Sequence, residues 1–428
     1  MKRKRKSLFL GVAAVLLGGA LAVPAVTAEA GTPQACTAAD ADIYRPPDRP
    51  SAPGTVIACR AVDSLPMVGG GTPMKAWKVQ YGSTDAHGKP IAVAGTVVVP
   101  EEAWAGPGER PLVSFAPGTL GIGPQCAFSK QLAGEYVDAY EGPNIAALLK
   151  AGYAVAATDG VGYLDGQVHP YVSGLDAGHA VLDMARVAAK VPGSGVSPTA
   201  QVGLWGYSEG GSGSLWAAQL AASYAPELKM AGVASGGVPG DLKQVGAQLN
   251  GGGFAGFLVD AVIGLSVTHP EMPFDELLND QGRKAIAKVK SLCAVGTVAQ
   301  FVGARIENYT TDHLSLADIY ALRGPDGTTW GELVDGNKLG VGIGPSGSGA
   351  RYEIGFPVLQ YRGLLDEVIP AETGYGTRRA YCEAGVGTRW KSYAGDHLLG
   401  DPQAINDVVD WLGERFAGRA MTSNCQAL

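Results

Sequence analysis

A short apolar run, a serine flanked by glycines and the start of a small-residue helix follow one another in Gln201-Val202-Gly203-Leu204-Trp205-Gly206-Tyr207-Ser208-Glu209-Gly210-Gly211. The pattern G-x-S-x-G within it is typical of a nucleophile elbow, in which a tight turn between a strand and a helix exposes a reactive serine. The pattern alone is weak evidence in a chain with 63 glycines. Its setting, after a strand pattern and before a helix pattern, supplies the specificity. We predict an elbow of Gly206, Tyr207 and Gly210 around Ser208; the alternative is a glycine-rich turn whose serine only caps the helix.

A serine hydroxyl becomes a nucleophile beside a general base, and that base needs a carboxylate to orient it. On a strand–elbow–helix scaffold the acid and then the histidine follow the serine along the chain. Of the three histidines after Ser208, His269 and His313 lie in a segment with helix patterns only, whereas His397 follows a resumed strand pattern. We predict His397 as the base, in a loop before the last helix. An exposed loop histidine is the alternative.

The orienting acid should lie just beyond a strand end, between Ser208 and His397. Asp366 occupies such a position. Glu367 is its competitor. Asp396 adjoins the base, but a sequence neighbour seldom reaches the ring of the base, so we expect Asp396 to form a turn. The predicted catalytic residues are Ser208, Asp366 and His397.

Acyl transfer also needs backbone N–H donors for the negative oxygen of the tetrahedral intermediate. One donor should be the N–H of Glu209, the residue after the nucleophile, and the other should come from Gly118 or Thr119, after the apolar run at 111–115. An ordinary Pro-Gly turn is the alternative for that loop. The side chain of Glu209 either faces solvent or hydrogen-bonds to the loop at 118–123.

Strand and helix patterns alternate along most of the chain. Alternating residues at 76–81 and 91–99 predict a hairpin. Further strands are expected at residues 111–115, 153–157, 201–205, 230–235, 356–361 and 389–393, and helices at 144–150, 176–190, 211–224 and 404–416. This alternation predicts the α/β class, with a mostly parallel sheet flanked by helices. Helix patterns at 254–266, 274–278 and 282–289 without strands predict an inserted helical cap.

The expected organisation has five parts, each defined by a change of pattern. They are a signal peptide (1–30), an irregular N-terminal arm (31–74), the first part of the core (75–239), the helical cap with a flexible glycine-rich return (240–350) and the second part of the core (351–428). A basic stretch at 2–6, an apolar run at 8–23 and the small-x-small site Ala28-Glu29-Ala30 predict export with cleavage near Ala30. A retained anchor is the alternative, but the apolar run is shorter than the ~20 residues that a membrane span needs.

Composition excludes several classes. The chain has 33 Lys and Arg against 40 Asp and Glu, a net charge of −7, and the balance after removal of residues 1–30 is 28 − 39 = −11. Nucleic-acid binders are usually basic, so no nucleic-acid partner is expected. A disordered chain would hold fewer hydrophobic residues than the 46% found here.

All six cysteines follow the expected signal peptide, at positions 36, 59, 126, 293, 382 and 425. In an oxidising compartment they indicate three disulfides, and the sequence leaves 15 pairings open. No CxxC or HExxH occurs, so no metal site is expected. Two G-x-G-x-x-G strings, at 251–256 and 342–347, lack the preceding strand of a nucleotide site, so no cofactor is expected.

With these residues in view, the chain resembles the secretory lipase family, α/β-hydrolases exported by yeasts and actinobacteria. The resemblance covers roughly residues 75–425. It depends on Gly206-Tyr207-Ser208-Glu209-Gly210-Gly211, on Asp159-Gly160-x-Gly162 with His169-Pro170-Tyr171, and on Leu365-Asp366 with Gly395-Asp396-His397. It implies the α/β-hydrolase fold with a helical cap and hydrolysis of triacylglycerols or other carboxylic esters without metal or cofactor. It also implies the Ser208, Asp366 and His397 triad.

The resemblance further implies disulfides Cys126–Cys293 and Cys382–Cys425, which leaves Cys36–Cys59. This chain departs from the family pattern in the expected oxyanion loop: some relatives carry an Asp there, whereas this chain has Pro117-Gly118-Thr119.

The expected function is therefore that of a secreted serine lipase or carboxylesterase acting on lipid or small ester substrates. The apolar segment at 254–265 either packs on the core or lines an acyl-chain pocket, and the cap is a candidate for transient contact with a lipid interface. The alternatives are a secreted acyltransferase or peptidase on the same fold, or a catalytically silent binding module. An apolar cap favours lipid over a peptide terminus.

Overall fold

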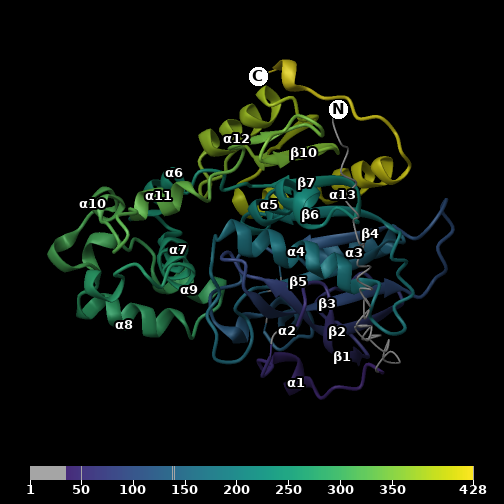
Figure 1. Ribbon diagram of the computed structural model, residues 1–428, viewed down its shortest axis with the longest axis horizontal. Coiled ribbons are helices and arrows are strands. Elements are labelled where there is room, and N and C mark those ends of the chain that lie inside the picture. Colours follow the sequence, from purple (N-terminus) through teal and green to yellow (C-terminus); the bar gives the residue numbers. More distant parts are fainter. Residues whose placement is uncertain (1–34, 50, 137, 139, 428) are drawn as a thin grey trace, which may run out of the picture. The chain divides into compact units, whose positions relative to one another are not determined.

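A nine-stranded sheet forms the core of the computed structural model, which describes residues 35–49, 51–136, 138 and 140–427 (Figure 1). The expected signal peptide lies outside the described residues. The strands of this sheet are β1 (Val56–Val62), β2 (Met74–Thr84), β3 (Pro90–Pro100), β4 (Leu112–Ala116), β5 (Ala154–Gly160), β6 (Gln201–Tyr207), β7 (Lys229–Gly236), β10 (Val358–Gly363) and β11 (Thr388–Tyr393). Their order is β1-β2-β3-β5-β4-β6-β7-β10-β11. The strands from β5 to β11 run parallel, and β1, β2 and β3 add antiparallel pairs, so the α/β prediction is confirmed.

Helices cover both faces of the sheet because its central strands carry apolar side chains on both faces, and both faces must be shielded from water. On one face α4 (Gly174–Ala188) and α5 (Glu209–Tyr224) pack against residues such as Leu204. On the other face α3 (Gly142–Lys150) and α13 (His397–Phe416) pack against residues such as Trp205. The helix α12 (Ala371–Glu383) connects the last two strands of the sheet, β10 and β11.

A set of short helices separates β7 from β10 in sequence, and it forms the cap. These helices are α6 (Leu242–Leu249), α7 (Ala255–Thr268), α8 (Asp280–Val289), α9 (Ala294–Gln300), α10 (Leu316–Ala321) and α11 (Trp330–Asp335). Figure 1 shows them gathered as one group. The segment expected at 274–278 is only the 3₁₀ turn Asp275–Leu277. The glycine-rich return to the sheet contains a pair of two-residue parallel strands, β8 (Ile343–Gly344) and β9 (Tyr352–Glu353).

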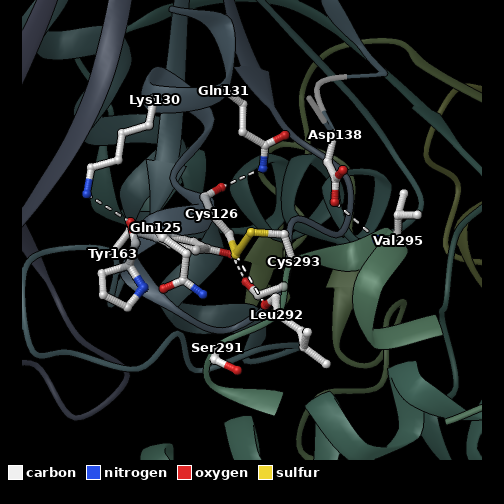
Figure 2. Close-up of a disulfide and its surroundings, with 12 residues drawn as sticks. Gln125, Cys126, Lys130, Gln131, Asp138, Tyr163, Ser291, Leu292, Cys293 and Val295 are labelled. Atoms are coloured by element: carbon white, nitrogen blue, oxygen red, sulfur yellow. Dashed lines mark hydrogen bonds between the residues drawn. A yellow bond between two sulfur atoms is a disulfide. The ribbon is translucent and has the colours of Figure 1, made fainter. Parts of the chain in front are cut away.

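Three disulfides staple the described chain, and they join the cysteines that the family resemblance pairs. Cys36–Cys59 ties the first described residues to β1, and Cys382–Cys425 ties the C-terminus to α12. Cys126–Cys293 joins the loop after β4 to the start of α9 in the cap, across 167 residues of sequence (Figure 2). Beside this disulfide the Val295 N–H donates to Asp138. The cap is therefore covalently fixed to the loop that was expected to supply an oxyanion donor.

The structure also departs from the sequence predictions near both ends of the described chain. The N-terminal arm expected to be irregular contains a short helix, α1 (Asp40–Tyr44), and the sheet strand β1, which pairs antiparallel with β2 with one irregularity between Val56 and Ala58. The last helix begins at His397 instead of residue 404, with Pro402 inside it. A proline inside a helix normally breaks it. Here the Asp396 carboxylate accepts the Leu399 N–H and caps the first turn, so that the helix begins before Pro402.

Candidate active site

Ser208 lies on the turn between β6 and α5 in a backbone conformation that few serines adopt. Its φ of 56° and ψ of −121° place it outside the regions that L-residues favour. The turn is held because the Ser208 N–H donates to the Gly236 carbonyl of β7 (2.9 Å) and the Ser212 N–H donates to the Ser208 carbonyl (3.0 Å). Such strain at a single residue between a strand and a helix is typical of a functional position. This is the geometry of the predicted elbow.

The neighbouring glycines are required by space. A Cβ atom on Gly206 would lie 2.2 Å from the Gly210 carbonyl oxygen, and one on Gly210 would lie 2.0 Å from that of Ala116. The latter value shows that the end of β4 and the start of α5 touch backbone to backbone. The loop that follows β4 is thereby held against the turn that carries Ser208.

The predicted base and acid meet the serine in a buried chain of hydrogen bonds. His397 Nε2 lies 3.0 Å from Ser208 Oγ, and His397 Nδ1 lies 2.9 Å from Asp366 Oδ2. The carboxylate only accepts, so Nδ1 carries the proton toward Asp366 and Nε2 accepts from the serine hydroxyl. Only 5% of the His397 side chain and 1% of the Asp366 side chain are exposed. The structure thus brings together all three residues predicted from the sequence.

Backbone contacts fix both members of this pair. Asp366 Oδ1 accepts the N–H groups of Val368 (3.1 Å) and Ile369 (2.8 Å), which leaves Oδ2 for the imidazole. His397 was expected in a loop, but it is the first residue of α13. Its N–H donates to Glu367 Oε2 (3.1 Å), so Glu367 holds the backbone of the histidine while Asp366 holds its ring.

Of the three N–H groups expected as oxyanion donors, those of Glu209 and Thr119 remain candidates, and that of Gly118 does not. The Glu209 N–H begins α5, where the first N–H groups have no acceptor within the helix. The Gly118 N–H, in contrast, donates to Glu141 Oε2 at 2.7 Å. Gly118 is therefore a correction to the sequence prediction: its N–H is engaged by a buried carboxyl from another segment, and Thr119 is the remaining candidate in this loop. Burial, with the nearby Asp401, raises the pKa of Glu141 well above its usual range.

An apolar pocket leads from Ser208 into the cap. Its lining comes almost entirely from aliphatic and aromatic side chains of the cap helices and of the segment after β10. They include Leu242, Val245, Leu249, Leu258, Ala261, Val262, Leu265, Ile319, Trp330, Val334, Val368 and Ile369. Within α7, Ile263 packs in a buried cluster with Ile122 and Tyr171 from outside the cap, whereas Leu258 and Val262 line the apolar pocket.

The sequence analysis missed a second buried pair beside the serine. His169 Nε2 lies 2.7 Å from Glu209 Oε1, so the largely buried Glu209 side chain pairs with His169, which is neither of the two arrangements considered from the sequence. Tyr171, two residues later, hydrogen-bonds to the hydroxyl of Thr119 (2.8 Å). The His169-Pro170-Tyr171 string was the available signal, but nothing in its spacing indicates which partners it meets.

Comparisons with known proteins find similarity to lipases along most of the chain. The family model described as "Secretory lipase" matches residues 129–424. Similar curated proteins include Lipase 5 of Candida albicans, 27% identical and covering 90% of this chain and 82% of its own. A secreted triacylglycerol lipase of Malassezia globosa is 28% identical over 90% and 80%. A probable inactive lipase of Mycobacterium tuberculosis is 28% identical over 90% and 84%.

Solved structures show the same fold. Candida antarctica lipase A in its closed state aligns with a TM-score of 0.76 at 23% identity, covering 90% of this chain and 87% of its own. The rice cell wall degrading esterase LipA of Xanthomonas oryzae aligns with a TM-score of 0.66 at 16% identity, over 85% and 100%. The family model matches more than half of this chain, and the chain therefore belongs to the secretory lipase family.

Proposed function

We propose that the protein is a secreted serine hydrolase of the lipase and carboxylesterase class, in which Ser208, His397 and Asp366 carry the reaction. The observation that carries the proposal is the buried chain of hydrogen bonds from Ser208 through His397 to Asp366. The apolar pocket that opens onto the serine supports an ester of a lipid acyl chain as substrate. Membership of the secretory lipase family supports the same class of reaction.

The reaction follows from these positions. His397 Nε2 takes the proton of Ser208 Oγ as this oxygen attacks the ester carbonyl. The oxygen that becomes negative is held by the N–H groups of Glu209 and Thr119, each donor contributing roughly 3–4 kcal/mol. His397 then gives the proton to the departing alcohol, which leaves an acyl group on Ser208. Water, deprotonated by the same imidazole, releases the acid. Asp366 keeps Nδ1–H directed away from the serine and stabilises the imidazolium.

Export is part of the proposal. The basic and apolar pattern of residues 1–23 supports a signal peptide removed near Ala30, and the Malassezia globosa relative is named as secreted. Over the part of the chain that the structure describes, no helix is long and apolar enough to cross a bilayer. The N-terminal sequence of the exported protein locates the cleavage point.

Replacement of the proposed nucleophile tests the function directly. We expect Ser208→Ala to lower kcat for p-nitrophenyl butyrate by about 10⁶-fold, and Asp366→Asn by about 10⁴-fold, since the asparagine stabilises the wrong imidazole tautomer. Ser212→Ala, one turn along the same helix, is the matched control and should keep its activity. Turnover by Ser208→Ala equal to the wild type, in protein with a wild-type melting temperature, would contradict the proposal. Activity on aminoacyl amides or acyl transfer to alcohols exceeding ester hydrolysis would assign the other reaction types.

The pocket makes a prediction about chain length. Ala261 faces the pocket from α7, whereas Val267 on the same helix is 41% exposed. Ala261→Trp should fill space that acyl carbons occupy. Excluding three methylenes removes about 2.4 kcal/mol, or roughly fiftyfold in kcat/KM for decanoyl and longer esters. Acetyl and butyryl esters should react at close to the wild-type rate, and Val267→Trp should leave the whole series unchanged. A uniform loss at every chain length would contradict an acyl role for the pocket.

A transient contact with a lipid surface is the finer part of the proposal. The sequence suggested the cap, and the cap exposes Val295 (65%) and Val302 (64%). Four further leucines flank the catalytic pair in sequence and are exposed by 53–72%. They are Leu364 and Leu365 before Asp366, and Leu398 and Leu399 after His397. The Leu365 N–H donates to the Gly395 carbonyl, which holds the two leucine pairs near each other.

Exposed apolar side chains around a lipid-hydrolysing site favour contact with an interface. We expect Leu365→Ser with Leu398→Ser to reduce turnover of emulsified triacylglycerol several-fold while soluble butyrate ester is hydrolysed as before. The pair Val295→Ser with Val302→Ser measures the part that the cap contributes. If both double variants hydrolyse the emulsion at the wild-type rate, the proposed contact is wrong.

A further inference from the structure

The segment between β5 and α4 contacts both residues whose N–H groups are proposed to hold the oxyanion. His169 Nε2 reaches the carboxyl of Glu209 (2.7 Å), and the Tyr171 hydroxyl reaches that of Thr119 (2.8 Å). We propose that His169 and Tyr171 are positioning residues of the oxyanion hole, and that His169 also neutralises the Glu209 carboxylate beside it. The proposal depends on the oxyanion role assigned above to Glu209 and Thr119.

The hydrogen bonds of His169 define its protonation. Its Nδ1 lies 2.6 Å from the Val161 carbonyl, which can only accept, so Nδ1 carries a proton. Its Nε2 faces the Glu209 carboxyl at a distance that requires a second proton between the two groups. Burial by itself lowers the pKa of His169, but the charge and hydrogen bond of Glu209 and the Val161 carbonyl outweigh burial and raise it. An imidazolium paired with a carboxylate satisfies all of these contacts.

Among the described residues, His169 is the one cationic partner within 4 Å of the Glu209 carboxyl. The other groups whose pKa the charge of Glu209 or His169 shifts are acids: Glu141 before α3, Asp176 on α4, Asp260 on α7, and the phenols of Tyr140, Tyr163 and Tyr171. Burial raises the pKa of Asp260 well above its usual range, and neither of its carboxyl oxygens has a hydrogen-bond partner among the residues that the structure describes. The Tyr163 ring stacks on the imidazole with ring centres 4.7 Å apart.

Hydrogen bonds fix the segment between β5 and α4 in place. The His169 N–H donates to the Ile122 carbonyl (3.0 Å), and the Tyr163 hydroxyl donates to the Gly121 carbonyl (2.6 Å), so the segment grips the loop that carries Thr119. Val172, which lines the apolar pocket, has a φ of 61°. A β-branched residue rarely adopts this conformation, and it persists only where the surrounding structure enforces it.

Charge explains why the pairing matters to the reaction. Glu209 places a carboxylate on the residue whose N–H must stabilise a developing negative oxygen. An unpaired carboxylate at this site would repel that oxygen through a water-poor environment, where charges interact strongly. The His169 imidazolium cancels this repulsion and anchors the side chain of the donor residue. Tyr171 does the corresponding anchoring for Thr119.

A rescue experiment separates charge from packing. His169→Gln should lower kcat for p-nitrophenyl butyrate by about 10- to 100-fold with KM within twofold, because only the transition state carries the negative oxygen. Adding Glu209→Gln to this variant removes the unpaired carboxylate and should raise kcat again at least severalfold. A histidine that only fills space would not be rescued. The control His179→Gln removes another buried histidine, which lies on α4 beside the Tyr224 ring, and should keep wild-type kcat.

Tyr171→Phe covers the case in which His169→Gln fails to fold. It removes one hydroxyl, and we expect about a tenfold fall in kcat with KM and melting temperature unchanged. Wild-type kcat in Tyr171→Phe, or a double variant no faster than His169→Gln, overturns the proposal. Ser208→Ala assayed in parallel identifies which idea has failed: an inactive Ser208→Ala beside fully active His169 and Tyr171 variants removes this inference alone, whereas an active Ser208→Ala removes the proposed function.

Discussion

The backbone of Ser208 is the constraint on which the site depends. Its left-handed φ costs free energy that most residues avoid, and the fold maintains it through the hydrogen bond to Gly236 and the close contact of Gly210 with the end of β4. Both contacts come from strands that flank β6 in the sheet. The position of the hydroxyl is therefore set by the sheet as a whole, and any loss of register between β4, β6 and β7 would move it.

The parallel arrangement of the strands explains why residues far apart in sequence meet. Ser208 follows β6, Asp366 follows β10 and His397 follows β11, and the carboxyl ends of parallel strands lie at one edge of a sheet. The cap is inserted in the sequence after β7 and places apolar side chains over this edge. The hydrogen bonds of Ser208, His397 and Asp366 therefore lie beside a largely apolar pocket. The disulfide Cys126–Cys293 fixes the cap to the loop that follows β4, the same loop that carries Thr119.

Much of this could be predicted from the sequence because it follows from local patterns. The G-x-S-x-G turn, the strand and helix alternation and the chain order of serine, acid and histidine are local or topological features. The missed features depend on contacts between distant segments. β1 forms because β2 offers an edge to pair with, and α13 starts at His397 because Asp396 caps it despite Pro402. The contacts of Gly118 with Glu141 and of Glu209 with His169 join buried polar groups of distant segments, and spacing along the chain does not encode them.

The central claim is that Ser208 is an activated nucleophile in the folded protein. Labelling with a fluorophosphonate, followed by peptide mass spectrometry, measures this directly, without assuming a natural substrate. The account predicts one modification on the peptide that contains Ser208, in native protein, and its loss when His397 is replaced by Ala or the protein is unfolded. Folded wild-type protein that stays unlabelled, or that carries the label on a different residue, would contradict the account.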